Sequence, residues 1–207
     1  MDLEIIIKIQ AMVRGWLVRS RNQKHKDSIT VAILTALLEN YNQNYVLYQK
    51  INNFLQYKRM RSDNFPSIIS ENIVKYVLNK RLKILANWDT SQSGDLTLKY
   101  KRLEIKSFIS DAPSSFGPNE HWDWLLFVDA KRHLEQHFTV YLVKLSNTSL
   151  IWQNIKVNKV ETFQQQADQK RRPRIAFQQL LHQIGDYCQV IFSDFLSSLN
   201  ILEDNII

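Results

Sequence analysis

Apolar and polar positions in the first 85 residues follow the spacing of amphipathic helices. Apolar side chains recur every three or four positions in residues 3–26 and again in residues 28–60. A further helix is predicted from Ser67 to Leu85, with Ser70 as its cap and Glu71 in its first turn. The amino-terminal part of the chain is therefore expected to be helical.

The hydrophobic period shortens to two after residue 88. The segments "DLTLKY" and "KRLEIKSF" alternate apolar and polar residues, which predicts two paired strands joined near residues 100–102. Two more strongly apolar runs follow, "DWLLFVDA" and "FTVYLVKL", as expected of central strands in a sheet that is covered on both faces. A sheet is therefore predicted in the middle of the chain.

Helical spacing returns in the last part of the chain. Residues 175–184 and residues 187–202 are both predicted to be helices. Helices, a run of strands and then helices indicate an α/β or α+β sandwich, not a helix bundle. We expect a basic amphipathic helix over residues 1–26 and a single domain over residues 27–207, because no long Gly or Ser linker divides the rest of the chain.

The chain is basic, with a net charge of +7 and a sequence pI of about 9.4. Positive charge is concentrated before residue 27, in "YKRMR" and in "QKRRPR", as a surface that faces phosphates would require. A polyanionic partner is therefore expected. There is no apolar run of about eighteen residues that would cross a membrane. With Cys188 as the only cysteine, we expect a soluble, intracellular protein without membrane contact or internal disulfides.

The segment "SGDLTLKYKRLEIKSF" contains a pair of acids and a lysine that suit metal chemistry. Glu104 and Lys106 would project from the same face of one strand, and a hairpin could bring Asp95 of the neighbouring strand beside them. Two carboxylates and a backbone carbonyl, such as that of Ile105, suit Mg²⁺, and Lys106 would lie beside a water at the site. The pattern predicts metal-assisted phosphodiester hydrolysis. A surface hairpin with alternating charges is the alternative.

The same segment resembles the active-site hairpin of the PD-(D/E)XK nuclease superfamily, and residues 60–186 resemble a small type II restriction endonuclease of that superfamily. The resemblance implies a restriction-endonuclease-like core, with a mixed central sheet flanked by helices. It also implies that Asp95 and Glu104 bind Mg²⁺ and that Lys106 positions or activates the attacking water. Glu71 would add a further acid to the metal site, and an interaction with the helix macrodipole is its alternative role.

The resemblance further implies an activity and an assembly. A type II restriction endonuclease would hydrolyse double-stranded DNA at a short specific sequence, and a homodimer would use two active sites to cut both strands. The chain departs from the superfamily pattern at Gly94, which precedes Asp95 in place of proline, but proline is not a metal ligand. Two alternatives stay open: a structure-specific resolvase or repair nuclease of the same fold, and a non-catalytic DNA-binding or adaptor protein.

Two further segments are expected to contact DNA. The loop "SDAPSSFGPNEHWDW" directly follows the expected catalytic strand, and its candidates for contacts to phosphates or base edges are Ser114, Ser115 and Asn119. The run "QKRRPR" supplies basic candidates, namely Lys170, Arg171, Arg172 and Arg174. An ordinary connecting loop and a solvated charged surface are the alternatives for these two segments.

The segment "IQAMVRGWLVR" follows the IQxxxRGxxxR pattern of the IQ motif, which resembles helices bound by calmodulin or myosin light chains. Ile9 would enter the apolar groove of such a partner, Arg14 and Arg19 would meet its acidic rim, and Gln10 belongs to the same motif. A calmodulin-like partner would place the protein in a virus-infected host cell rather than in the bacterial cytoplasm. The alternative is a helix that packs on the nuclease domain or follows DNA.

Overall fold

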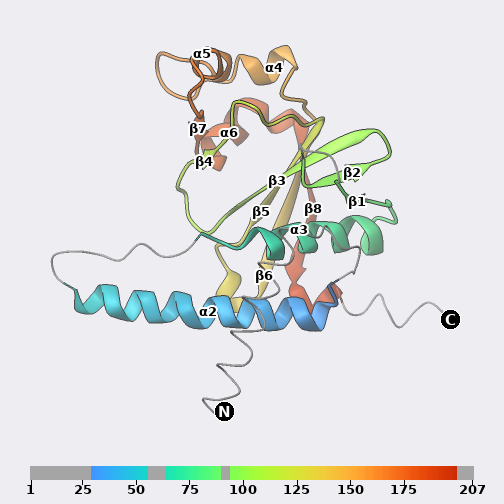
Figure 1. The fold of residues 1–207 in the computed structure, drawn as a ribbon, viewed down its shortest axis with the longest axis vertical. Coiled ribbons are helices and arrows are strands. Elements are labelled where there is room, and N and C mark those ends of the chain that lie inside the picture. Colours follow the sequence, from blue (N-terminus) through green and yellow to red (C-terminus); the bar gives the residue numbers. More distant parts are fainter. Residues whose placement is uncertain (1–28, 56–63, 90–93, 200–207) are drawn as a thin grey trace, which may run out of the picture.

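A mixed six-stranded sheet forms the centre of the protein (Figure 1). The computed structural model describes residues 29–55, 64–89 and 94–199. In the order in which they lie side by side, the strands are β1 (Asn87–Trp88), β2 (Leu96–Leu98), β3 (Lys101–Phe108), β5 (Trp124–Asp129), β6 (His137–Val143) and β8 (Cys188–Phe195). β3 and β5 run parallel, whereas the other neighbours run antiparallel. The expected mixed sheet is confirmed.

Helices cover both faces of this sheet, as expected of the α+β class (Figure 1). One face carries the helices α2 (Val31–Phe54) and α3 (Ser67–Tyr76). The other face carries the helices α4 (Leu150–Gln153), α5 (Phe163–Asp168) and α6 (Phe177–Ile184). On this second side, a small antiparallel sheet joins β4 (Ser114–Ser115) to β7 (Arg174–Ile175).

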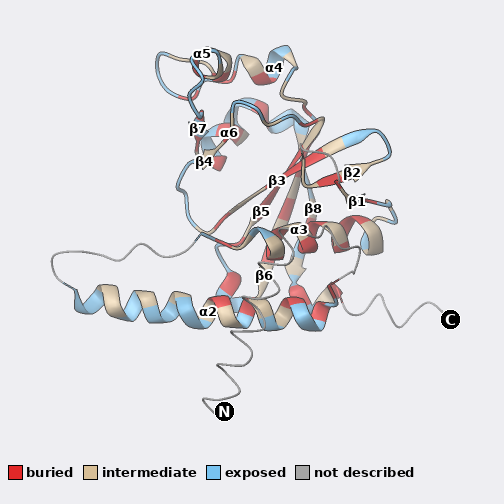
Figure 2. Cartoon of the chain, viewed as in Figure 1, coloured by how far each residue is buried: buried red, intermediate tan, exposed pale blue. Residues whose placement is uncertain are grey.

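Successive side chains of the central strands enter two separate hydrophobic cores. Figure 2 shows buried residues along these strands. In β5, Leu126 and Val128 pack with the layer of α2 and α3, and Leu125 and Phe127 pack with the layer of α4, α5 and α6. All four side chains are buried. Because both faces are covered, the strand needs no polar positions in its interior, which is why its sequence is apolar from Trp124 to Val128.

The start of α3 differs from the sequence prediction in its cap. Pro66 occupies the cap position, whereas Ser70 lies inside the helix and donates its hydroxyl to the carbonyl of Ser67 at 3.0 Å. The fixed backbone angle of proline suits a helix start, so the helix begins four residues before the position that a Ser70 cap implied. Glu71 therefore lies beyond the first turn, which removes the macrodipole interpretation. The helix continues as a π-helical segment, Val77–Arg81, and stops before the expected end.

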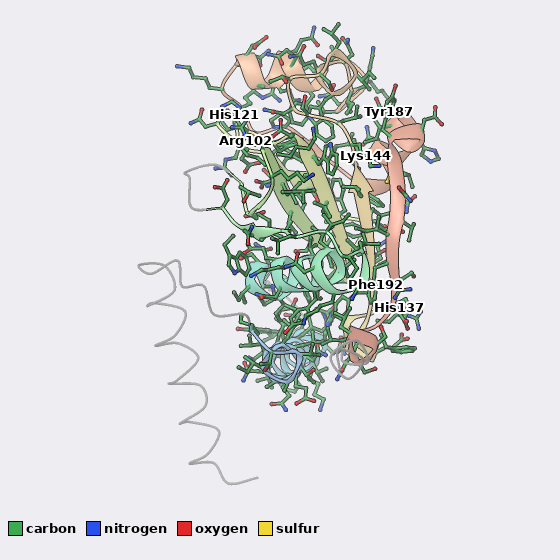
Figure 3. The ribbon with its side chains drawn as sticks, turned by 90° about the vertical axis from the view of Figure 1, so that its right-hand side faces the viewer. Arg102, His121, His137, Lys144, Tyr187 and Phe192 are labelled. Carbon is green, nitrogen blue, oxygen red and sulfur yellow. The ribbon has the colours of Figure 1, made fainter. Side chains whose placement is uncertain are left out.

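The segment after residue 187 is a strand, so the predicted carboxyl-terminal helix is wrong. β8 pairs with β6 in an antiparallel ladder, and Figure 3 shows it at the outer edge of the sheet, with Tyr187 at one end. Consecutive β-branched and aromatic residues, Val190, Ile191 and Phe192, favour a strand. Over such a short apolar run, helical and strand periodicities cannot be told apart. A short 3₁₀ turn over Leu196–Leu199 follows the strand.

The expected hairpin of β2 and β3 is present, but its turn is at Lys99 and Tyr100, slightly earlier than predicted. β2 pairs only with residues 101–103, the start of β3. From Glu104 onward, this edge of β3 has no strand partner within the described ranges. A strand edge without a neighbour leaves room for side chains and ligands, and the candidate active site lies there.

Two sequence predictions fall on residues 1–28, which lie outside the described part of the chain. These are the amphipathic helix with its IQ pattern and the division of the chain near residue 26. Within the described ranges, no helix combines the length and the apolar character that crossing a lipid bilayer requires.

Candidate active site

Asp95 lies immediately before β2, next to the unpaired edge of β3. Its N–H donates to the carbonyl of Leu103 at 2.9 Å, and its carboxylate accepts a hydrogen bond from the N–H of Ile105 at 2.7 Å. The chain reaches this position through Gly94, whose φ of +100° is a backbone conformation that L-residues rarely adopt. The hairpin thereby places the Asp95 carboxylate against the strand that carries Glu104.

Lys106 lies between two carboxylates. Its Nζ donates to Glu104 Oε1 at 2.6 Å and to Glu120 Oε2 at 3.0 Å. Glu104 and Lys106 are two positions apart on β3, so they share a face as the alternation of the strand predicts. Glu120 was not a sequence candidate, because it belongs to the loop before β5 and nothing in the spacing indicates contact with β3. The only feature of the sequence that could have indicated Glu120 is its position directly after Asn119, a candidate for DNA contact.

We call Glu71, Asp95, Glu104, Lys106 and Glu120 the carboxylate cluster, because four acids there surround one ammonium group. Burial raises the pKa of Asp95 to about 7, and repulsion from Glu71 and Glu120 raises it further. The hydrogen bond from the Ile105 N–H and the charge of Lys106 lower this pKa, but they do not cancel the rise. Burial and then the charge of Asp95 raise the pKa of Glu104 to about 7 as well, even though Lys106 opposes the shift. Lys106 therefore neutralises only part of the negative charge.

Glu71 faces this cluster from α3. Burial raises its pKa, a hydrogen bond from the Ser67 side chain lowers it, and the charge of Glu104 raises it again. For Lys106, burial lowers the pKa, but the two glutamates outweigh burial and hold the pKa above its ordinary value. Lys106 is therefore a cation at neutral pH, and Glu71 adds to the excess of acidic groups.

The donor set of this site fits a hard divalent cation. Mg²⁺ prefers carboxylate and carbonyl oxygens and keeps several waters, and Asp95, Glu104 and the Ile105 carbonyl are the oxygen donors assigned from the sequence. A divalent cation would also neutralise the repulsion that raises the pKa of Asp95 and Glu104. Among the residues that the structure describes, no three His, Cys, Asp or Glu side chains are close enough to enclose a metal by themselves. Waters and substrate oxygens would have to complete the shell.

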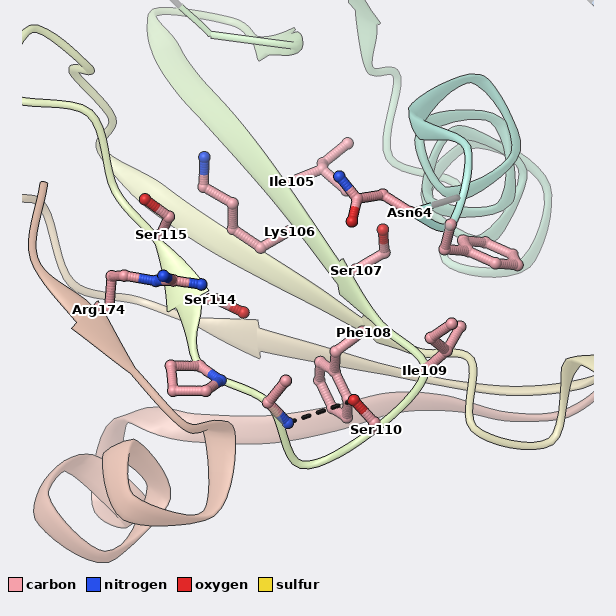
Figure 4. A pocket seen from close by; sticks show the side chains of 13 residues that line it. Asn64, Ile105, Lys106, Ser107, Phe108, Ile109, Ser110, Ser114, Ser115 and Arg174 are labelled. Atoms are coloured by element: carbon pink, nitrogen blue, oxygen red, sulfur yellow. Dashed lines mark hydrogen bonds between the residues drawn. The ribbon is translucent and has the colours of Figure 1, made fainter. Parts of the chain in front are cut away.

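A cleft of about 530 Å³ opens beside Lys106 (Figure 4). Three of the predicted DNA contacts line it, namely Ser114, Ser115 and Arg174. β4 and β7 bring them together, because Ser115 pairs with Arg174 in the small sheet. Figure 4 shows Lys106 of β3 and Arg174 of β7 at the same cleft, with Ser114 and Ser115 beside them. The loop after β3 and the basic run therefore meet beside Lys106, a candidate catalytic residue.

The other predicted DNA contacts lie outside the residues that line this cleft. Asn119 is exposed in the loop, directly before Glu120. Lys170, Arg171 and Arg172 are exposed in the segment that leads to β7. Arg171 donates to Glu161 at 2.7 Å and to Gln169 at 3.0 Å, so part of its charge is already neutralised within the protein.

Comparisons with known proteins identify the family of the chain. The model of the Bsp6I restriction endonuclease family matches residues 35–183, a range that contains the whole carboxylate cluster. The type II restriction enzyme Bsp6I of Bacillus sp. (strain RFL6) is 25% identical over 146 residues, which are 69% of this chain and 79% of that enzyme. The model of the IQ calmodulin-binding motif matches residues 3–21. No solved structure matches the chain. The chain belongs to the Bsp6I restriction endonuclease family and is a type II restriction endonuclease.

Proposed function

We propose that this restriction endonuclease cuts duplex DNA with Mg²⁺ bound by Asp95, Glu104 and the carbonyl of Ile105. The observation that carries the proposal is the partly buried carboxylate cluster, in which Lys106 is the one ammonium group against four acids. Such a cluster is costly in the free protein and becomes favourable when a cation enters. Glu71 would contribute through its charge or through a water of the metal shell.

The residues of the cluster would share the work of hydrolysis. When bound, Mg²⁺ supplies a Lewis acid that offsets the negative charge building on the scissile phosphate. Lys106, held as a cation by its two glutamates, would orient the attacking water and stabilise the same charge. In-line attack on phosphorus would leave 5′-phosphate and 3′-hydroxyl ends.

The cleft beside Lys106 would hold the DNA backbone. Arg174 would contact a phosphate, and Ser114 and Ser115 would contact phosphates or base edges, because all three line the cleft with Lys106. Asn119 and the exposed basic residues would bind DNA beyond the cleft. These basic residues are Lys170, Arg171 and Arg172.

We also propose that the enzyme works as a homodimer. Within the described ranges the chain carries a single carboxylate cluster, and a duplex has two strands to cut. A symmetric pair of chains would present one site to each strand of a symmetric sequence. A restriction enzyme meets DNA inside the cell, so we place the reaction in the cytoplasm.

For the amino-terminal segment we propose a separate role from that of the nuclease domain, which would span residues 27–207. The match to the IQ motif supports binding of a calmodulin-like protein through Ile9, Gln10, Arg14 and Arg19. Calmodulin should then capture the intact chain in a pull-down, and Ile9→Glu with Arg14→Glu should abolish the capture without loss of DNA cleavage. Equal capture of both forms would contradict this role.

The nuclease proposal is tested by incubating the purified protein with unmodified phage DNA and Mg²⁺ and sequencing the ends of the fragments. Discrete fragments with one common end sequence are expected. Glu104→Ala and Lys106→Ala should abolish cleavage while DNA binding, measured by gel shift, is retained. Glu135→Ala is a matched control, because Glu135 is an exposed acid paired with Arg132 outside the cluster. Full cleavage by both cluster variants would refute the site.

A further inference from the structure

Glu120 is the member of the carboxylate cluster that the sequence did not indicate. We infer that Glu120 is a positioning residue that holds the Lys106 ammonium group in the active site while Glu104 serves the metal. This inference rests on the proposed roles of Glu104 and Lys106. It gives a role to a side chain on the loop between β4 and β5, outside the hairpin that carries Asp95, Glu104 and Lys106.

The contacts of Lys106 show why a second carboxylate is needed. Lys106 Nζ is shared between Glu104 at 2.6 Å and Glu120 at 3.0 Å. A cation bound by Glu104 would draw the charge of that carboxylate and repel the ammonium group of Lys106. Glu120 would then be the remaining anion that keeps Lys106 in place. The ring of Phe116, 5.6 Å from Lys106 Nζ, forms a further wall of this position.

The loop that carries Glu120 is built to hold this side chain. The Glu120 N–H donates to the carbonyl of Gly117 at 3.2 Å, and the Glu120 carbonyl accepts a hydrogen bond from the Asn147 side chain at 3.0 Å. Asn147 also accepts a hydrogen bond from the N–H of Trp122 at 3.3 Å, so one amide fixes both sides of Glu120. The backbone of Glu120 is therefore anchored independently of its contact with Lys106.

Gly117 makes room for the Glu120 side chain. A Cβ at Gly117 would lie 2.9 Å from Glu120 Oε1 and 3.1 Å from both Cγ and Cδ of the same side chain. Only the end of one flexible side chain would have to move, so an alanine there should displace the Glu120 carboxylate without preventing folding. Gly185 offers a matched control, because a Cβ at that position meets nothing within 4 Å.

The first test removes the charge of Glu120 and keeps its shape. With phage DNA cleaved under single-turnover conditions, Glu120→Gln should slow cleavage about 10- to 100-fold, the range typical of residues that orient an active-site group. Two readouts that do not depend on activity should be retained: DNA binding in a gel shift, and a rise in melting temperature on addition of Mg²⁺. A cleavage rate equal to wild type would overturn the inference. Loss of the Mg²⁺-induced rise would also overturn it, because Glu120 would then be a metal ligand.

The second test uses geometry instead of charge. Gly117→Ala should slow cleavage by displacing Glu120, whereas Gly185→Ala should cleave at the wild-type rate. The double variant Gly117→Ala/Glu120→Gln should be no slower than Glu120→Gln alone, because both changes remove one interaction. Independent, multiplying effects of the two changes would contradict the role of Glu120.

The inference and the proposed function fail in different ways. If Glu104→Ala and Lys106→Ala cut DNA normally, the active site itself is wrongly assigned. If those two variants are inactive while Glu120→Gln cuts at the wild-type rate, the site stands and the positioning role of Glu120 is lost.

Discussion

Two polar clusters in the described part of the protein differ in whether their charged and hydrogen-bonding groups all have partners. The carboxylate cluster holds four acids around Lys106, and the pKa of both Asp95 and Glu104 is raised to about 7. The other cluster surrounds His133, which is 2% exposed. Its Nδ1 lies 2.6 Å from Asn42 Oδ1, and the Asn42 amide donates to the His133 carbonyl at 3.0 Å.

The His133 cluster is complete without a ligand. Aromatic rings enclose the imidazole, with the Tyr45 ring centroid at 4.7 Å and the Tyr41 ring centroid at 5.3 Å. Burial lowers the pKa of His133, so the ring is held neutral. A buried polar group that is hydrogen-bonded and neutral stabilises the fold, whereas a buried group of like charges needs a partner from outside. The comparison therefore separates a structural cluster from a binding one.

The largest expected effect is the loss of activity in Asp95→Asn. Cleavage should fall at least about 10²- to 10³-fold, since the substitution removes a metal-binding charge. At pH 8 and without divalent cations, the same variant should have a higher free energy of unfolding than the wild type, because repulsion with Glu71 is relieved. Urea denaturation with chelator present measures this. If the variant is both inactive and less stable than the wild type, Asp95 has a structural role. The carboxylate cluster would then not differ from the His133 cluster in the way described above.

The His133 cluster should respond in the opposite sense. His133→Ala removes a buried ring and leaves Asn42 Oδ1 without its imidazole partner, so the free energy of unfolding should fall by about 2–4 kcal/mol. Cleavage at 25 °C should stay within several-fold of the wild-type rate while the variant remains folded. Thermal melts and cleavage assays on the same preparation check both statements. Loss of cleavage without loss of stability would give His133 a functional role.

The two clusters should also differ in how stability depends on pH. The ordinary pKa values of Asp95 and Glu104 are 3.8 and 4.5, against about 7 in the folded protein. Between these values the folded state binds more protons, so the free energy of unfolding should fall as pH rises from about 4 to about 7, on the order of 1–3 kcal/mol. This fall should shrink in Asp95→Asn and in the presence of Mg²⁺.

For His133 the sign is reversed, because burial lowers the pKa of the ring in the folded protein. Below its ordinary pKa of 6.5 the unfolded state binds more protons, so His133 costs stability as pH falls. The difference between wild type and His133→Ala should therefore narrow toward acidic pH. Urea titrations from pH 5 to pH 8 measure how the free energy of unfolding changes with pH in the wild type, Asp95→Asn and His133→Ala. If the three proteins show the same pH dependence, the pKa shifts are wrongly assigned to these residues.

The smallest expected effect belongs to an exposed cation of the cleft. Arg174→Ala should weaken DNA binding about fivefold and reduce the slope of log affinity against log salt by about one, as loss of one phosphate contact predicts. Arg132→Ala should change neither quantity, because Arg132 is an exposed arginine paired with Glu135. Gel shifts at several salt concentrations make the comparison. Equal effects of both variants would remove Arg174 from the DNA surface.

The parts of the site that follow strand alternation were predictable from the sequence. Glu104 and Lys106 share a face because they are two positions apart on one strand, and the hairpin brings Asp95 to them. The apolar runs of β5 and β6 were likewise recognisable as central strands. In each case the deciding interaction lies within one element or between neighbours along the chain.

The parts that depend on distant contacts were not predictable. Glu120 reaches Lys106 because Asn147, far along the chain, anchors its loop. β8 is a strand because β6 offers it an edge, whereas its short apolar run fits either periodicity. Ser70 has the chemistry of a cap, but Pro66 starts the helix earlier. Tertiary partners decided the first two outcomes, and the backbone geometry of Pro66 decided the third.

The bend at Gly94 has a consequence for finding related enzymes by pattern. Proline fixes φ near −65°, so it cannot adopt the +100° of Gly94. A Cβ at this position would also lie 3.0 Å from Asp89 Oδ2. In this enzyme the backbone geometry therefore requires glycine before Asp95, at the position where the PD-(D/E)XK pattern has proline. Scans that demand a Pro-Asp dipeptide will pass over nucleases that enter the hairpin in this way, and allowing glycine there should recover them.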